Sequence, residues 1–207
     1  MKLAIPRILS QKGLLTLLSG FLIWQSAQLV SRITEQTHVA SIGTMLIQSV
    51  FLNLFITGIF LIGYAFPVHR LFPDSYYAAV CSEAFASACS ILRIEQFRKL
   101  LRRTFWGARF NKRHFFDGTR RGFAQFDKNT RISESSHTLA FVTILLVSVY
   151  LGIVADPLLA VGVILVDLGF NFYPAMLQRY HWSRLLAVRK QTVRATHHPP
   201  IGRLTKR

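Results

Sequence analysis

The chain has 207 residues, is 51% hydrophobic, and carries 25 Lys and Arg against 9 Asp and Glu, a formal net charge of +16. A soluble domain this apolar is rarely so basic, so charge and apolarity must be separated along the chain. The composition therefore argues against an ordinary soluble domain and predicts an integral membrane protein.

Four apolar segments follow one another, each near the roughly 20 residues that a helix needs to cross a bilayer. They are Leu14–Val30, Met45–Phe66, Thr138–Ala155 and Pro157–Leu177. The first contains Gln25 and Gln28, so it also suits a tilted or interfacial helix. The sequence thus predicts an all-α membrane protein with about four transmembrane helices, of which the last two form a hairpin about Asp156.

Lys and Arg gather on one side of the membrane in this topology. In order we expect an N-terminal extension (1–43), a second transmembrane helix (44–66), a basic cytoplasmic helical region (67–137), a transmembrane hairpin (138–177) and a basic tail (178–207). Of all Lys and Arg, only Arg32 falls on the opposite side. The positive-inside rule then places both termini in the cytoplasm, as for a multi-pass protein of a bacterial cytoplasmic membrane.

The longest polar region, Leu71–Arg131, shows no transmembrane signal. Asp74 suits the cap of a helix running from about Ser75 to about Trp106. Residues 105–131 are expected to be irregular, with a turn at Asp117-Gly118.

Basic residues alternate with apolar ones over Arg93–Arg103. This pattern suits a helix that lies on an anionic membrane surface, and equally the solvated face of a packed helix. We expect no nucleic-acid partner, because no nucleic-acid fold motif is present and basic residues beside spans commonly contact lipid phosphates. The tail after Thr192 is expected to be disordered.

Polar residues form a line along the last apolar helix. Asp167, Asn171, Pro174 and Gln178 follow at intervals of four, three and four, which places them on one side of an α-helix. Amide and ionisable groups are costly inside a membrane and indicate a functional site. Asp167 equally suits a hydrogen bond between helices, for example to Thr143 or Ser148.

Glu134-x-x-His137 places a carboxylate and an imidazole on one face of the preceding helix. Folding the hairpin about Asp156 brings His137 level with about residue 176 and Glu134 level with about residue 179. A carboxylate beside an imidazole can orient the ring as a general base for a sugar hydroxyl. The pair equally suits a structural role at the start of a helix. Glu134 would then interact with the N-terminal end of the helix dipole, and His137 would lie at the membrane interface.

The remaining charged residues include candidate ligands for phosphate and for metal ions. Arg109, Arg179 and Arg184 can hold the phosphates of acyl-CoA through forked hydrogen bonds, or contact lipid headgroups. An E-x-x-H iron site needs a second such motif and further Glu residues from other helices, and only Glu83 and Glu95 remain. We therefore expect no metal site.

Several short motifs occur in the order seen in one known family. They are Pro73-Asp74-x-Tyr76, Glu95, Arg109, Asp117-Gly118, Glu134-x-x-His137, Asn171, Gln178-Arg179-Tyr180 and Arg184-Leu185. Their order and several of their spacings resemble the glycosyl-4,4'-diaponeurosporenoate acyltransferases, small membrane enzymes of carotenoid glycoside biosynthesis. The likeness covers about residues 64–187 and departs from the family at Asn111-Lys112, Phe115-Phe116 and His181-Trp182.

The resemblance implies transfer of a fatty acyl group from acyl-CoA to a hydroxyl of a glycosylated carotenoid or similar glycolipid at the cytoplasmic face, with no cofactor. Under this hypothesis His137 deprotonates the hydroxyl, and Glu134 or Glu95 orients the ring. Asn171 and Gln178 stabilise the oxyanion or position the acceptor. Substrate binding is assigned to Arg109, Asp117, Arg179, Tyr180 and Arg184.

A second hypothesis is a non-catalytic small subunit of a larger membrane complex; a homo-oligomer is compatible with either hypothesis. The polar line would then hold a partner helix, and the basic face would bind anionic membrane lipid. A transporter is disfavoured, because four spans with a single polar line offer little for a two-sided pathway.

Overall fold

The computed structural model describes residues 4–36, 40–60, 62, 65–78, 82–104 and 120–197. These residues form helices and turns and contain no strand. Among them, four helical segments are long and apolar enough to cross a membrane: Gln11–Thr34, Ile42–Ile59, Ala124–Val154 and Pro157–Arg184. The prediction of an all-α protein with four spans is confirmed.

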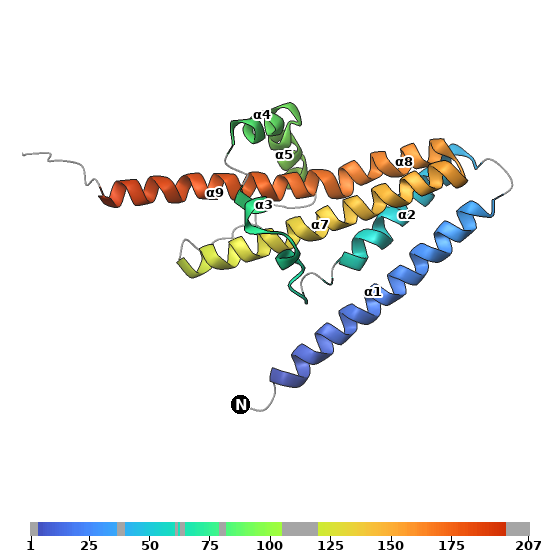
Figure 1. Ribbon diagram of the computed structural model, residues 1–207, viewed down its shortest axis with the longest axis horizontal. Coiled ribbons are helices and arrows are strands. Elements are labelled where there is room, and N and C mark those ends of the chain that lie inside the picture. Colours follow the sequence, from blue (N-terminus) through green and yellow to red (C-terminus); the bar gives the residue numbers. More distant parts are fainter. Residues whose placement is uncertain are drawn as a thin grey trace, which may run out of the picture.

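The first two spans are α1 (Ala4–Thr34) and α2 (Ile42–Ile59). Figure 1 shows α1 diverging from the other spans toward its N-terminal end. The side chain of Ser41 caps α2 by accepting a hydrogen bond from the Thr44 N–H. α2 ends at Ile59, short of the predicted Phe66. At this end the Phe60 N–H donates to the carbonyls of Thr57 and Gly58, a tighter turn than that of an α-helix.

The last two spans form the predicted hairpin. α7 (Arg120–Val154) is followed by α8 (Pro157–Asp167), a π-helical turn η4 (Leu168–Phe172) and α9 (Tyr173–His197). Asp156 caps α8 by accepting from the Leu158 N–H at 2.7 Å, and Pro157 suits the first helical position. The sharp turn at Asp156 is therefore confirmed.

Both outer ends of this hairpin are more helical than expected. Residues 120–131 were predicted irregular but belong to α7, where Asp127–Arg131 and Gln125–Asn129 bond at the i,i+4 spacing of a helix. Glu134 consequently lies well inside α7 and not at a helix start. The tail, predicted disordered after Thr192, is helical to His197, in keeping with its Ala, Gln, Lys and Arg residues.

The helix predicted over Ser75–Trp106 is divided into α3 (Asp74–Ala78), α4 (Glu83–Ile91) and α5 (Ile94–Thr104). The side chain of Ser82 caps α4 by accepting from the Phe85 N–H at 3.2 Å. Between α4 and α5, Arg93 has a φ of 51°, a left-handed conformation that interrupts a helix. A short 3₁₀ turn, η2 (Val68–Leu71), precedes α3.

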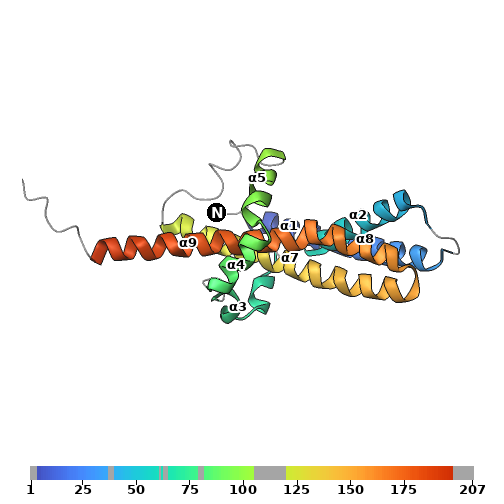
Figure 2. The ribbon, with the colours of Figure 1, turned by 90° about the horizontal axis from the view of Figure 1, so that it is seen from above.

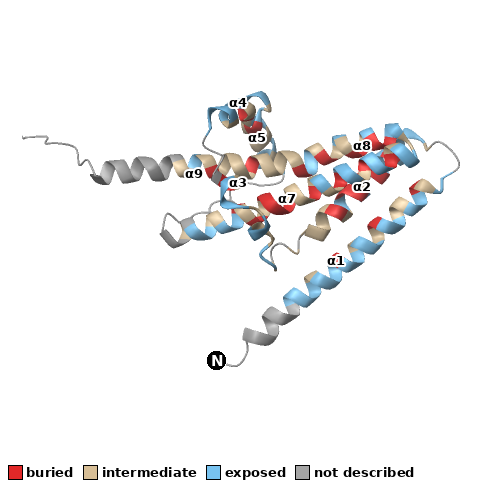
Figure 3. Cartoon of the chain, in the orientation of Figure 1, coloured by how far each residue is buried: buried red, intermediate tan, exposed pale blue. Residues whose placement is uncertain are grey.

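Two apolar clusters hold these elements together. Ile33, Leu52, Ile144, Leu151 and Val163 are among the buried residues that join the four spans. Cys89, Ile94 and Leu177 form a second cluster, which packs α4 and α5 against α9. The views from the side and from above agree in placing this helical arm on α9, and burial follows the faces that α2, α7 and α8 turn toward one another (Figures 1, 2 and 3). The polar region between the second and third spans therefore packs on the hairpin through α9.

Candidate active site

A polar cluster is buried where α2, α7 and the η4 turn meet. Asn171 lies at its centre and has 0% of its surface exposed. Its Nδ2 donates to Asp167 Oδ1 at 2.8 Å and to Thr57 Oγ1 at 2.9 Å. Its Oδ1 lies 3.1 Å from His137 Nδ1 and accepts from the Thr57 hydroxyl at 3.1 Å. The hydrogen-bonding groups of this amide are thus all engaged within the protein.

Asn171 lies in the π turn and meets α7 at His137. We predicted that His137 would lie level with about residue 176, but its ring contacts Asn171. One extra residue in the wider turn η4 does not account for that difference, since Glu134 still bonds to Arg179 as the predicted alignment expects. The predicted polar line is correct for Asp167 and Asn171, which are bonded to each other, but His137 meets this line at Asn171 and not near residue 176.

A buried ion pair lies next to this cluster. Arg179 Nε donates to Glu134 Oε1 at 2.5 Å, as the predicted alignment of these two positions requires, and the Glu134 side chain is 1% exposed. Arg179 also donates from Nη2 to the Tyr76 carbonyl at 3.3 Å and lies 4.0 Å from the centre of the Tyr76 ring. The Tyr76 hydroxyl is 3.2 Å from Thr138 Oγ1. Glu134 is therefore the partner of Arg179, and the His137 ring makes its hydrogen bond with Asn171 Oδ1 instead.

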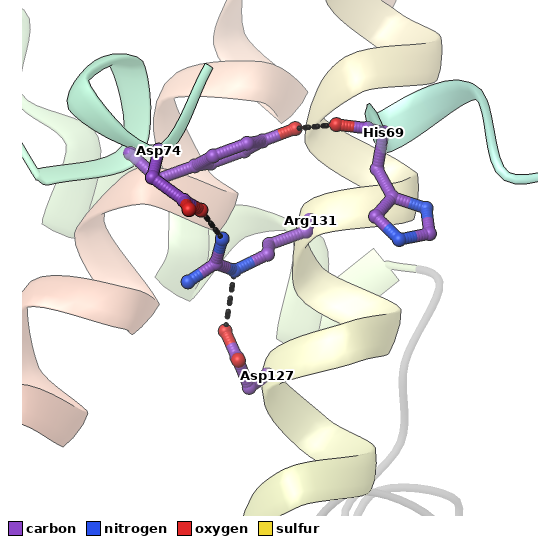
Figure 4. A network of polar contacts seen from close by, with 5 residues as sticks. His69, Asp74, Asp127 and Arg131 are labelled. Carbon is purple, nitrogen blue, oxygen red and sulfur yellow. Dashed lines mark hydrogen bonds and ion pairs between the residues drawn. The ribbon is translucent and has the colours of Figure 1, made fainter. Parts of the chain in front are cut away.

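A second arginine fixes the segment that contains η2 and α3 (Figure 4). Arg131 donates to Asp74 Oδ1 at 3.1 Å and to Asp127 Oδ1 at 2.9 Å, and its guanidinium lies 4.6 Å from the centre of the Tyr77 ring. The Tyr77 hydroxyl donates to the His69 carbonyl at 3.0 Å. Burial raises the pKa of Tyr77 to about 12, so the phenol stays protonated and keeps this bond.

Glu95 and Tyr180 meet at the arm. The Tyr180 hydroxyl donates to Glu95 Oε2 at 3.0 Å, and Arg98 donates to the other carboxylate oxygen. The hydrogen bond from Arg98 holds the pKa of Glu95 below its usual 4.5. Tyr180 lies about 13 Å beyond Asn171 along α9 at 1.5 Å per residue, so this pair supports the arm and does not orient His137.

Two further predicted site residues, Arg184 and Gln178, lie on α9 beyond the polar cluster. Arg184 is exposed and lies 5.8 Å from the centre of the Tyr180 ring, while Gln178 is partly exposed on the same helix. Arg109 and Asp117 lie outside the described residues. Within the described part of the chain, no three His, Cys, Asp or Glu residues are grouped so that they could hold a metal ion.

The comparisons with known proteins identify the family. Residues 73–191, more than half of the chain, match the family model described as glycosyl-4,4'-diaponeurosporenoate acyltransferase. The chain belongs to this family. Neither the curated proteins nor the solved structures contain a significant match. Membership of the glycosyl-4,4'-diaponeurosporenoate acyltransferases indicates acyl transfer in carotenoid glycoside modification as the class of reaction.

The family region supplies most of the polar contacts, but α2 lies outside it. Thr57 of α2 bonds to Asn171, and Asn53 donates to the Val163 carbonyl at 3.2 Å. Neither Thr57 nor Asn53 was predicted as a site residue from the sequence. Ser49, Asn53 and Thr57 follow at intervals of four within an apolar span, and this polar line is the same kind of signal that singled out Asp167 and Asn171.

Proposed function

We propose that the protein transfers a fatty acyl group from acyl-CoA to a hydroxyl of a glycosylated carotenoid, with His137 as the general base. The contact between His137 Nδ1 and the buried Asn171 amide carries this proposal. An imidazole held through one nitrogen can offer the other to a substrate. His137 is only partly buried, whereas Asn171 is fully buried, so the ring lies at the edge of the polar cluster.

The depth of His137 suits substrates of opposite solubility. The residue lies about 26 Å along α7 from Val154 at 1.5 Å per residue, near the inner limit of a hydrocarbon core of about 30 Å. A glycosylated carotenoid can approach this level from the lipid, while polar acyl-CoA approaches from the aqueous side. In the predicted four-span topology, all Lys and Arg residues except Arg32 fall on the side of the membrane that His137 approaches, which supports the cytoplasmic face.

The proposed reaction is a direct transfer. His137 Nε2 takes the proton from the sugar hydroxyl as its oxygen attacks the thioester carbonyl carbon. The tetrahedral intermediate then collapses, the carbon–sulfur bond breaks, and the proton passes from the imidazolium to the leaving CoA thiolate. The products are the acylated glycoside and free CoA, and no redox step is required.

Basic side chains at the inner end are proposed to bind the donor. Arg184 on α9 is exposed, as are Lys99, Arg102 and Arg103 on α5. Guanidinium groups form paired hydrogen bonds with phosphates, and the CoA moiety carries several phosphates. Arg179 is assigned instead to structural support, because Glu134 and Tyr76 already occupy its guanidinium. Gln178 remains a candidate for positioning the substrates, and so do Arg109 and Asp117.

Pigment and lipid mass spectrometry tests the proposal in cells with and without the gene. We expect the deletion and His137→Gln, at matched protein level, to lose an acylated glycoside and accumulate its unacylated precursor. Thr143→Val is the matched control, because the Thr143 hydroxyl bonds only within its own helix, to Leu139 O at 2.8 Å. Unchanged lipids in the deletion strain would contradict the proposal, and fixed-ratio co-purification with a larger complex would then favour the non-catalytic subunit.

A further inference from the structure

We propose that Asp167 is a positioning residue for acyl transfer: acting through Asn171, it holds His137 in the tautomer with the proton on Nδ1 and the lone pair on Nε2. This inference rests on the proposed function, in which His137 is the base. It also makes a claim about hydrogen positions that can be tested without any substrate.

The first step concerns the orientation of the Asn171 amide. Its Nδ2 lies 2.8 Å from Asp167 Oδ1, and a carboxyl oxygen without a proton can only accept a hydrogen bond. The reversed amide would place two acceptor oxygens in contact at that distance. Thr57 does not discriminate between the orientations, because its hydroxyl both donates and accepts. Asp167 therefore decides which end of the amide faces His137.

The second step concerns the imidazole. With Nδ2 turned toward Asp167, Asn171 presents Oδ1 to His137 Nδ1 at 3.1 Å. A carbonyl oxygen accepts and cannot donate, so Nδ1 must carry the proton of the neutral ring. The lone pair then lies on Nε2, on the far side of the ring from Asn171. The opposite tautomer would present an N–H to the sugar hydroxyl and could not remove its proton.

The buried position of Asp167 and Asn171 supports a fixed set of hydrogen bonds from Asp167 through Asn171 to His137. Asp167 and Asn171 are both 0% exposed, so bulk water cannot compete for the amide. An ordinary hydrogen bond between helices was the alternative expected from the sequence, but the hydroxyls of Thr143 and Ser148 bond to carbonyls of their own helix. In the described residues, Asp167 bonds to Asn171 alone. A carboxyl group within a span is costly, and Oδ2 of Asp167 is buried without a partner among the described residues, so the contact of Oδ1 with Asn171 is the interaction that a functional role would use.

The tautomer of His137 can be read directly by nitrogen NMR. Protein labelled with ¹⁵N-histidine is measured in lipid nanodiscs at a pH where the ring is neutral, and the signal that disappears in His137→Gln is assigned to His137. We expect the unmodified protein to show a protonated Nδ1 and an unprotonated Nε2. A protonated Nε2 in the unmodified protein would overturn the inference without any further variant.

The Asp167→Asn variant tests the cause. Its side-chain amide can donate to Asn171, which permits the Asn171 amide to turn and the proton of His137 to move to Nε2. We expect that change of tautomer, together with a loss of transfer activity of about 10²–10⁴-fold, the usual contribution of a general base. Thr143→Val should change neither quantity.

The two readouts separate this inference from the proposed function. An unchanged tautomer in folded Asp167→Asn protein overturns the positioning role, even if activity falls. A changed tautomer in a protein whose unmodified form transfers no acyl group supports the relay but contradicts the proposed function. Helix content measured by circular dichroism, together with size-exclusion chromatography, establishes that each variant is folded.

Discussion

Removing one partner of the buried ion pair between Glu134 and Arg179 should strongly destabilise the protein. The side chain of Glu134 is 1% exposed and that of Arg179 is 19% exposed, so Arg179→Met leaves a carboxylate buried without its partner. Breaking a buried pair in this way costs about 3–5 kcal/mol. The same substitution removes the guanidinium from the Tyr76 ring, a contact worth about 0.5–2 kcal/mol, so the total is expected near the upper end of the range.

A double-mutant cycle separates the pair from its surroundings. Glu134→Gln keeps an acceptor for Arg179 and should cost about 1.5–3 kcal/mol, as expected for loss of a charged hydrogen-bond partner. The double variant Glu134→Gln with Arg179→Met has no buried charge at this point. We expect it to be more stable than the sum of the single effects predicts, by at least about 1.5 kcal/mol.

The assay is reversible unfolding in mixed detergent micelles, with helix content as the signal. Arg184→Met is the matched control, because Arg184 is exposed and its aromatic contact should be worth less than about 1 kcal/mol. Additivity of the two single effects within about 0.5 kcal/mol would refute the coupling. A cost below about 1 kcal/mol for Arg179→Met would show that the pair behaves as an exposed one.

Three further predictions concern helix packing, the π turn and pH. A Cβ at Gly162 would lie 3.1 Å from Ser49 Oγ, so Gly162→Leu should separate α2 from α8 and lower the free energy of unfolding by about 1–3 kcal/mol, measured in the same micelles. Deleting Gly169 should turn η4 into a regular α-helical turn without rotating α8 relative to α9. Because Asn171 would then lose its contact with His137, we expect transfer activity to fall at least about 10²-fold. The Glu95 carboxyl has a folded pKa below its usual 4.5, so its stabilisation is present above about pH 4.5 and is lost as the pH falls through the folded pKa. Thermal unfolding between pH 6 and pH 3 should therefore depend less on pH in Glu95→Gln than in the unmodified protein.

Each of these predictions has a control within the chain. Gly20→Leu should leave the free energy of unfolding nearly unchanged, because nothing lies within 4 Å of a Cβ at that position. If Gly162→Leu and Gly20→Leu lowered this free energy by the same amount, α2 and α8 would not be closely packed at Gly162. Deletion of Leu165 from regular α8 should destabilise the protein, since it turns the rest of the helix by about 100°. If deletion of Gly169 were as damaging to stability, the account of the π turn would be wrong. An identical pH profile for Glu95→Gln would show that Glu95 does not determine the acid response.

Much of the architecture follows from the distribution of apolar residues. The four spans, the turn at Asp156 and the pairing of Glu134 with Arg179 depend on segment length and regular helical rise, and all were predictable. The break before α5 was not, because Arg93 takes a left-handed conformation that the sequence normally signals with Gly or Asn. The composition of Leu168–Phe172 likewise gives no sign of a π turn.

The polar groups of the two hairpin helices were expected to meet, but the hydrogen bonds of Asn171 were not predictable. Asn171 was assigned to the oxyanion or to positioning the acceptor, whereas its two amide hydrogens are donated to Asp167 and Thr57 and its oxygen faces His137. Which residue on α2 reaches Asn171 depends on how closely two helices approach, as Gly162 permits here. A single sequence does not specify that distance.

The most direct measurement is acyl transfer by the purified protein in lipid nanodiscs. A glycosylated carotenoid and isotopically labelled acyl-CoA are supplied, and mass spectrometry follows the labelled product while a thiol reagent follows free CoA. We predict that labelled acyl glycoside and free CoA appear in equal amounts, and that His137→Gln reduces both by about 10²–10⁴-fold while Thr143→Val does not. Undiminished transfer by folded His137→Gln protein, or no transfer by the unmodified protein, would contradict the account.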